Sequence, residues 1–456
     1  MAGLFTLHLS SCKKELLFSK NHLTFSVDTV LFDTVFTTIG TTTKRFKIYN
    51  NANRPVKIDE IVLAGGKTSA YRVNLDGESG TDFKNIVLPA EDSLFMFVEA
   101  TLGETSASTP FIITDSVLFK SNGKTQSVKL AAWGRNAHFY NDTIVSGVWT
   151  NDKPHVIYNL ALVDSLSSLT IQEGTEIYMH KGAMLYVKSA QLIIDGSYNN
   201  KVTIQGDRLE PFYADVKGQY YGIYLDHALE STIDNAVIKN GTVGVHIYDD
   251  HPTNTNRTLT ITNTEISNHS SYGIFNYSGG SIMGENLNIH NNSIYAYILL
   301  EGGSHNFRHS QFLSYGSEGN QPAVAIKNYF TRSDGVTYIG DVGEGAFYNS
   351  IIDGPGEFQV GYDTLTNNGT VSISMEYNTN LIRQKTPFNG SSFVTNLWNK
   401  NIQYENVSEN KFIIKPNTPG HEQGNASLTL TPALLSRDID GKNRSSVPDI
   451  GAFSVD

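Results

Sequence analysis

A repeat of about two dozen residues, between Ile233 and Ser314, constrains the fold of this chain more than any other feature. Four segments carry the repeat: DNAVIKNG, TNTEISNHS, ENLNIHNNS and RHSQFLSYG. Their apolar anchors, which follow one another at steps of 28, 23 and 23 residues, are Ile238, Ile266, Ile289 and Phe312. Self-similarity at a short fixed period is the signature of a solenoid. Because the unit is strand-like, we predict a β-helix.

Polar residues on either side of each anchor follow the same steps. These pairs, each five residues apart, are Asn235 and Asn240, Asn263 and Asn268, Asn286 and Asn291, and His309 and Ser314. Asparagine tolerates the left-handed backbone of tight turns, and stacked asparagine amides form ladders. We therefore assign these residues a structural role at the corners of the coils.

Further strand-like segments surround the repeat. Residues 168–208 are a string of short alternating strands punctuated by glycines. Each strand is too short to be stable alone, but coils stacked ~4.8 Å apart would pair every strand above and below and bury a continuous interior. A second row of strands alternates with the repeat segments, and its members are YGIYLDH (221–227), VGVHIYDDH (243–251), YGIFNYS (272–278) and YAYILLEGG (295–303).

Residues 16–134 are predicted to form a separate domain. About eight short strand candidates, separated by turn signals such as Asp76-Gly77, are typical of an immunoglobulin-like β-sandwich. Ser121–Gly123, between two long alternating segments, predicts a hairpin. Residues 135–456 are expected to form a right-handed single-stranded parallel β-helix with a C-terminal capping region. The predicted fold class is therefore all-β.

Cys12 is the only cysteine, so no intrachain disulfide can form. The segment LHLSSC (7–12) is similar to a bacterial lipobox, which implies lipidation of Cys12 and a signal-peptide remnant with lipobox in residues 1–15. Signal peptides have ~15–30 residues and a basic start. Because Cys12 follows only eleven residues, we expect the true start to lie further upstream. No other run approaches the ~20 apolar residues of a membrane span, so the lipid is the predicted membrane attachment.

The charge distribution argues against nucleic acid as a partner. The formal net charge is −11, and basic residues cluster only at Lys13-Lys14 and Lys44-Arg45. Phosphate backbones are bound by concentrated lysine and arginine. We therefore expect no nucleic-acid binding.

Several of these features together resemble a known family. In chain order they are the lipobox, the β-sandwich, the coil opening SLTIQEGTEIYMHKGAMLYV (168–187), the stretch VTIQGDRLEPFYADVKGQYYGIYL (202–225), the NxxI-type repeats and DIDGKN…PDIGAF near the C-terminus. The combination resembles the right-handed parallel β-helix lipoproteins of Bacteroidetes-type bacteria, over nearly the whole chain. The ending resembles the choice-of-anchor tail of surface-associated β-helix proteins.

That resemblance implies a pectate-lyase-like superfamily fold. It also implies an outer-membrane lipid anchor, on the periplasmic or the cell-surface side. It implies no particular activity, because one fold hosts many functions.

One outward column of the stacked coils is predicted to carry sugar-binding groups. The side chains two and four positions after Gly222, Gly244 and Gly273 should face outward, and they are Tyr224, Asp226, His246, Tyr248, Phe275 and Tyr277. His227, Asp249, Asp250, His251 and Glu301 lie just beyond them. The long step of the repeat places an extra loop between Asp250 and Leu259, and inserts of solenoids collect on the binding face. Rings can stack on sugars, or they can simply cover the sheet.

Two chemistries could use this column. A glycosidase needs two carboxylates flanking the scissile bond, and Asp226 with Asp249 or Asp250 is the candidate pair. A calcium-assisted uronate lyase needs acidic Ca²⁺ ligands and a base near the α-proton. The same three aspartates are its candidate ligands, and the candidate bases are Lys239, Arg257 and Arg308. None of these residues sits in a diagnostic motif.

The leading hypothesis is a lipid-anchored envelope protein that binds glycans or another envelope component, or serves as a structural module. Its predicted binding residues are Tyr224, Asp226, His227, His246, Tyr248, Asp249, Asp250 and Tyr277. The alternative is a polysaccharide-cleaving enzyme, with Asp226, Asp249, Asp250 and Arg308 as the candidate catalytic residues. No cofactor is predicted apart from the Ca²⁺ that the lyase chemistry would need.

Overall fold

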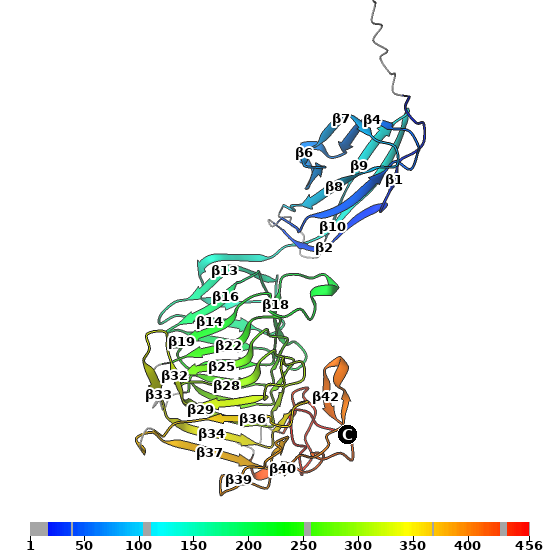
Figure 1. Cartoon of the computed structure of the whole chain (residues 1–456). Coiled ribbons are helices and arrows are strands. Elements are labelled where there is room, and N and C mark those ends of the chain that lie inside the picture. Colours follow the sequence, from blue (N-terminus) through cyan, green and yellow to red (C-terminus); the bar gives the residue numbers. More distant parts are fainter. Residues whose placement is uncertain are drawn as a thin grey trace, which may run out of the picture. The chain divides into compact units, whose positions relative to one another are not determined.

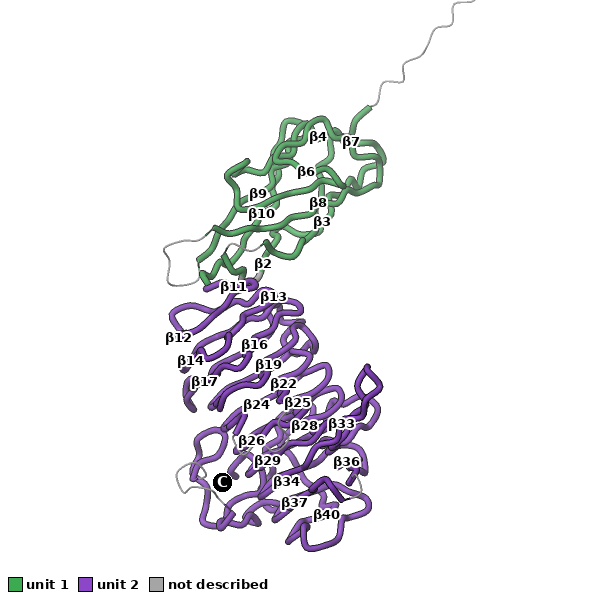
Figure 2. Tube along the Cα trace, turned by 90° about the vertical axis from the view of Figure 1, so that its left-hand side faces the viewer, with its two compact units in different colours: residues 1–137 green, residues 138–456 purple. Residues whose placement is uncertain are grey.

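The computed structural model describes residues 17–37, 40–103, 111–249, 257–366, 369–428 and 436–455. The chain divides into two compact units, residues 1–137 and 138–456 (Figure 2). Across these described ranges, regular structure consists of strands and a few short 3₁₀ turns, so the protein is all-β as predicted. No helix in the described part is long and apolar enough to cross a membrane.

The first unit contains two five-stranded sheets that share one core. One sheet has the order β1 (Thr24–Phe25), β3 (Lys44–Tyr49), β8 (Ser93–Ala100), β5 (Tyr71–Leu75) and β6 (Glu78–Gly80). The other has the order β2 (Thr29–Phe36), β10 (Lys124–Arg135), β9 (Phe111–Ser121), β4 (Val56–Leu63) and β7 (Asp82–Leu88). Phe46 of the first sheet and Ile58 of the second belong to the same buried cluster. An immunoglobulin-like topology for this unit stays a prediction.

The hairpin predicted at Ser121–Gly123 is present. Strands β9 and β10 pair antiparallel, with Ser121 opposite Lys124. Asn122 and Gly123 both have positive φ, 53° and 73°. Two consecutive left-handed residues match the twist of the flanking strands, and asparagine followed by glycine is the sequence that adopts this turn at least cost.

The second unit is a stack of coils in which parallel strands form three faces (Figure 1). The first face contains β13 (His155–Val163), β16 (Met184–Lys188), β19 (Gly222–Asp226), β22 (Val243–Tyr248), β25 (Tyr272–Ser278), β28 (Tyr295–Leu299), β31 (Val324–Lys327) and β36 (Val360–Asp363). Strand β11 (His138–Ile144) pairs with β13 at its start.

The other two faces are built in the same way. The second contains β15 (Glu176–Met179), β18 (Val202–Gly206), β21 (Ala236–Lys239), β24 (Glu265–Ser267), β27 (Asn288–His290), β30 (Gln311–Leu313), β35 (Ile351–Asp353), β38 (Leu381–Ile382) and β40 (Leu397–Trp398). The third contains β12 (Gly147–Trp149), β14 (Ser168–Gln172), β17 (Gln191–Asp195), β20 (Ser231–Asp234), β23 (Leu259–Thr262), β26 (Ser281–Glu285), β29 (Gly303–Arg308), β34 (Val342–Tyr348), β37 (Ile373–Asn378) and β39 (Phe393–Val394). Strands in parallel register on successive coils make this unit a parallel β-helix.

The repeat of the sequence is the stacking of the second face. The four anchors lie directly above one another, with Ile238 opposite Ile266, Ile266 opposite Ile289, and Ile289 opposite Phe312. All four side chains are fully buried. The predicted register is therefore confirmed, and apolar side chains that meet at the strand spacing form one continuous core.

The corner residues take the left-handed backbone that asparagine tolerates. Their φ angles lie between 43° and 52° at the first corner, and the residues are Asn235, Asn263, Asn286, His309 and Asn349. At the second corner Asn240, Asn268 and Asn291 also have positive φ. The Asn286 amide donates to the Asn263 carbonyl oxygen at 2.9 Å. The structural role predicted for these asparagines is confirmed.

The C-terminal segment crosses several coils rather than only closing the last one. Its hairpin, β41 (Tyr404–Asn406) with β42 (Lys411–Ile414), lies beside the lower coils (Figure 1) and packs Phe412 and Ile414 into a cluster with Leu313 and Ile351. Further along, the segment hydrogen-bonds to earlier coils. The bonds run from Lys201 to the Ile439 carbonyl at 3.3 Å, from Asn286 to the Arg437 carbonyl at 3.0 Å, and from Asn349 to the Asn425 carbonyl at 2.9 Å.

Candidate functional site

Aromatic rings on the outside of the first face stack along the axis of the coils. Tyr186, Tyr224, His246 and Phe275 stand opposite one another in register. Successive ring centroids are 5.1, 4.3 and 4.6 Å apart, with interplanar angles of 23°, 8° and 14°. The side chains between them along each strand, such as Ile223 and Ile247, are buried. The outward placement predicted for this column is therefore confirmed.

This stacking decides what the column can do. Each ring covers the face of the next, and the column ends against Leu162 below Tyr186 and Ile298 above Phe275. A sugar stacks on an exposed ring face, whereas these rings offer mainly their edges. Offset stacking of aromatic rings also stabilises a sheet. We conclude that Tyr224 and His246 mainly cover the first face.

His246 is fixed in its neutral form. Its Nδ1 atom is 2.6 Å from the hydroxyl of Tyr221, and burial lowers the pKa of the imidazole to about 4. Desolvation disfavours the charged form of a histidine. His246 therefore does not provide a positive charge for a ligand at neutral pH.

Asp226 ends β19 and is held by two neighbours. The hydroxyl of Tyr186 donates to one carboxylate oxygen, and the Nδ1 atom of His227 lies 2.5 Å from the other. Burial and the nearby Asp226 charge raise the pKa of Tyr186 to about 12. The Asp226 side chain keeps 14% of its surface exposed. It can therefore still accept hydrogen bonds from a ligand hydroxyl.

A hairpin with no counterpart in the sequence pattern joins this face. Strands β32 (Tyr329–Thr331) and β33 (Thr337–Ile339) pair antiparallel. Between them Arg332 donates from Nε to Glu301 at 2.8 Å and from Nη2 to the other carboxylate oxygen. The Glu301 side chain is only 2% exposed. A buried carboxylate requires a paired, hydrogen-bonded cation, so this ion pair anchors the hairpin to the coil after β28.

Aromatic side chains surround the guanidinium of Arg332. It lies 5.7 Å from the ring centre of Tyr248, 5.6 Å from that of Tyr277 and 3.9 Å from that of Tyr338. Tyr248 and Tyr277 are tilted by 41° at 5.7 Å, so they do not cover each other as the stacked rings do. Phe330 meets Tyr277 edge-on and, like Tyr338, keeps 38% of its surface exposed. We call Tyr248, Tyr277, Glu301, Phe330, Arg332 and Tyr338 the hairpin cluster.

The predicted acid–base set is only partly assembled. Asp249 follows β22 and is buried, with 4% of its surface exposed, while Asp250 and His251 lie outside the described residues. Lys239 ends β21 on the second face, and Arg308 ends β29 on the third face. Both candidate bases therefore lie on other faces than Asp226, which ends β19 on the first face. Arg257, which precedes β23, contacts the Met283 sulfur of the third face.

Sequence reasoning missed the surroundings of Arg308. Its Nε atom donates to Asn306 at 3.1 Å, and Asn306 donates in turn to Glu344 at 2.7 Å. Its guanidinium lies 4.7 Å from the ring centre of Tyr348. In register beside Arg308, Glu285 is 1% exposed, and neither of its carboxyl oxygens has a hydrogen-bond partner among the described residues. Burial raises the pKa of Glu285. The outward position of Glu285 could be predicted from the alternation of buried and outward residues along β26. No feature of the neighbouring sequence indicates that this outward side chain is buried.

A possible metal-binding group lies at the start of the second unit. Ligand atoms of His138, Asp152 and His155 are within 4.8 Å of one another. Both nitrogens of His155 already have partners, the Tyr140 hydroxyl at 2.9 Å and the Thr150 carbonyl at 3.0 Å. Burial lowers the pKa of His155 to about 4. A metal would have to replace one of these bonds, so we assign the three residues a structural role.

Comparison with known proteins assigns no family. No protein-family model and no curated protein matches the chain. Among solved structures, the catalytic unit of a GH87 α-1,3-glucanase from Streptomyces thermodiastaticus matches at 9% identity and a TM-score of 0.22, over 78% of this chain and 89% of that one. A family 123 glycoside hydrolase from Clostridium perfringens matches at 9% identity and a TM-score of 0.18, over 25% of this chain and 26% of that one. The E. coli chaperone DraB matches at 13% identity and a TM-score of 0.18, over 25% and 55%.

Proposed function

We propose that the β-helix unit binds a carbohydrate at the hairpin cluster, with Asp226 and His227 on the adjoining coil as further contacts. One observation carries this proposal. Between β25 and β26 the chain turns the corner with residues 279–280, whereas between β31 and β34 it uses residues 328–341. The coil does not need these extra residues to close. They place exposed aromatic side chains beside the outward tyrosines.

The chemistry of the hairpin cluster suits a sugar. Phe330 and Tyr338 offer partly exposed rings for the apolar faces of sugar rings. The Arg332 guanidinium, oriented by Glu301, can donate hydrogen bonds to hydroxyl or carboxylate oxygens. Ligand sites combine apolar surface with a few oriented polar groups, and this cluster supplies both from a hairpin held by a buried ion pair.

A binding series tests the proposal. The purified protein is titrated with neutral and uronate-containing polysaccharides, and binding is followed by calorimetry. We expect Tyr338→Ala to weaken binding about tenfold, because loss of a buried aromatic contact costs on the order of 1–3 kcal/mol. Val336→Ala on the same hairpin, 50% exposed in the free protein, is the matched control and should bind normally. Absence of binding across the panel, or equal binding by both variants, would overturn the proposal.

Polysaccharide cleavage is the second candidate function, and the third face supports it. A glycosidase needs a protonated acid and a second carboxylate. Burial raises the pKa of Glu285, and Glu344 and Glu376 carry exposed carboxylates in the network around Arg308 and Tyr348. The same polysaccharide panel is assayed for new reducing ends and unsaturated products. Turnover that Glu285→Gln abolishes would support cleavage, and a panel without product would exclude it.

We also propose that the protein is attached to the outer membrane through a lipid on Cys12, on its periplasmic or cell-surface side. The support is the LHLSSC segment and the order of features shared with Bacteroidetes-type β-helix lipoproteins. Cys12 lies outside the described residues. The same family resemblance leads us to propose that the coils of the second unit are right-handed and that the first unit has an immunoglobulin-like topology. It also leads us to propose that the C-terminal segment is a choice-of-anchor tail. The Cys12→Ser variant should be found in the soluble fraction when cells are fractionated. Continued association of this variant with membranes would contradict the lipid anchor.

A further inference from the structure

A small pocket lies at the corner between the second and first faces, near the end of the coil stack. Its volume is about 290 Å³, and it is lined by Pro355, Gly356, Glu357, Arg383, Lys385 and Asn399. Arg383 and Lys385 follow β38, while the first three residues form the connection from β35 to β36. The pocket therefore brings two cations from one coil against a loop of the preceding coil.

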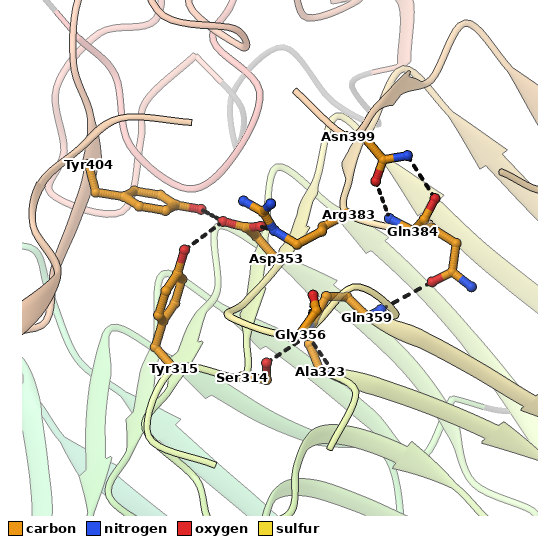
Figure 3. Close-up of polar contacts among 10 residues, drawn as sticks. All are labelled: Ser314, Tyr315, Ala323, Asp353, Gly356, Gln359, Arg383, Gln384, Asn399 and Tyr404. Carbon is orange, nitrogen blue, oxygen red and sulfur yellow. Dashed lines mark hydrogen bonds and ion pairs between the residues drawn. The ribbon is translucent and has the colours of Figure 1, made fainter. Parts of the chain in front are cut away.

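The guanidinium of Arg383 is fixed from behind by a buried carboxylate. Its Nε atom donates to Asp353 at 2.6 Å, and the Asp353 side chain is 1% exposed. The other Asp353 oxygen accepts hydroxyl groups from Tyr315 and Tyr404, each at 3.0 Å. Figure 3 shows these three side chains converging on Asp353. Arg383 is held through Nε, its side chain keeps 30% of its surface exposed, and it lines the pocket.

Side-chain amides make the wall of the pocket rigid. The Asn399 side chain donates to the Gln384 carbonyl at 2.8 Å and accepts from the Gln384 amide at 2.9 Å. The side-chain Oε1 atom of Gln384 accepts a hydrogen bond from the Gln359 backbone N–H at 3.1 Å, and the Gln359 side chain donates to the Gly356 backbone carbonyl at 3.0 Å (Figure 3). The loop with Gly356 and the coil with Arg383 are thus held in a fixed relation. A site fixed before binding loses little entropy when a ligand enters.

Lys385 supplies the second cation and has a replaceable partner. Its ammonium group lies 2.6 Å from Glu357, and both side chains are well exposed, at 58% and 65%. Exposed ion pairs contribute little to stability. Glu357 therefore occupies the place of an anion in the free pocket and can turn away when a stronger one enters.

We propose that this pocket is a binding site for a small oxyanion, such as a carboxylate or a sulfate. An oxygen of the anion meets the part of the Arg383 guanidinium that lines the pocket, because guanidinium groups bind oxyanions through charge-assisted hydrogen bonds. A further oxygen replaces Glu357 at Lys385. The proposal does not depend on carbohydrate binding at the hairpin cluster, because the two sites use different corners of the coils.

The experiment titrates the purified full chain with inorganic sulfate, galacturonate and galactose, followed by calorimetry. We expect saturable millimolar binding of the two anions, competition between them, and no binding of galactose. Lys385→Gln should weaken anion binding about fivefold, and Glu357→Gln should strengthen it about threefold, because it removes the competing carboxylate. The opposite signs of these two effects cannot come from a role in stability.

A second exposed ion pair provides matched controls. Lys411 and Glu409 lie 2.7 Å apart, with exposures of 58% and 57%, and neither residue lines the pocket. Lys411→Gln and Glu409→Gln should leave both titrations unchanged. Tighter binding of galacturonate would identify a sugar carboxylate as the source of the anion, and tighter binding of sulfate an inorganic one. Absence of saturable binding, or equal responses of the pocket and control variants, would overturn the proposal.

Discussion

The phenol of Tyr404, in the C-terminal hairpin, donates a 3.0 Å hydrogen bond to Asp353, which ends a strand 51 residues earlier. Both side chains are buried, at 6% and 1% exposure. Two tyrosine hydroxyls and one guanidinium therefore satisfy a carboxylate that would otherwise be costly to bury. This bond makes the C-terminal hairpin part of the stack.

Tyr404→Phe should lower the free energy of unfolding by about 1–3 kcal/mol, because it removes one donor from a buried carboxylate. Chemical denaturation measures the change. Tyr329→Phe is the matched control, since Tyr329 makes a similar 2.7 Å bond to Asp363 on an exposed surface. We expect no measurable effect there. Equal losses of unfolding free energy in the two variants would show that the contribution of the Tyr404–Asp353 bond does not depend on the burial of Asp353.

Glu285 should make stability fall as the pH rises. Burial raises its pKa above the ordinary value of 4.5, so the folded state binds the proton more tightly than the unfolded chain. The contribution of Glu285 to the free energy of unfolding is then complete below pH 4.5 and is lost as the pH rises through the raised pKa of the folded state. Glu285→Gln should remove this loss and stabilise the protein at neutral pH. Denaturation midpoints from pH 4 to 8 measure the effect, and Glu344→Gln, at an exposed site, is the control.

The ion pair between Arg332 and Glu301 should determine whether the β32–β33 hairpin stays attached to the coils. Arg332→Met leaves the Glu301 charge buried without its partner, and breaking a buried pair costs about 3–5 kcal/mol. We expect faster proteolysis within residues 328–341. The double variant Arg332→Met with Glu301→Gln should recover most of the loss, because no uncompensated charge remains. A double variant as unstable as the single one would contradict this assignment.

The asparagine corner can be separated into backbone and side-chain contributions. Asn263 has a φ of 50° and hydrogen-bonds to Asp234 at 2.8 Å. Asn263→Gly and Asn263→Ala both lose the amide, but only alanine opposes the left-handed backbone. Alanine should therefore cost about 1–2 kcal/mol more than glycine. Thermal unfolding measures the difference, and equal values would mean that the side-chain bonds alone matter.

Periodic features of the fold could be predicted from the sequence. The anchors such as Ile238 and the corner residues such as Asn263 recur because every coil meets the same need at the same place. The alternation of buried and outward residues also placed Tyr224 and Tyr248 correctly. What it could not show is that Tyr224 is covered by its neighbours, since ring stacking depends on side-chain torsions and not on the register.

Contacts between distant, unrepeated segments could not be predicted. Glu301 and Arg332 are 31 residues apart, and Arg332 lies in a stretch without period. Arg308 is a candidate lyase base beside Asp226 in the sequence-based prediction, yet the two residues end strands of different faces. Placing a residue on a face requires the number of strands in each coil. The third row repeats at the same steps of 28, 23 and 23 residues, but a glycine, Gly284, at one of its buried positions weakens the apolar pattern of that row.

The C-terminal segment changes how the stack should melt. Coils that touch only their neighbours can unravel one at a time from either end. Here one strap, bonded at Lys201, Asn286, Asn349 and Asp353, spans rungs far apart in the chain. Loss of this strap would therefore be expected to destabilise the middle coils, at Lys201, Asn286 and Asn349, before the terminal coils. The segment from Tyr404 to Ile439 therefore helps to turn a column of nearly independent units into one cooperative body.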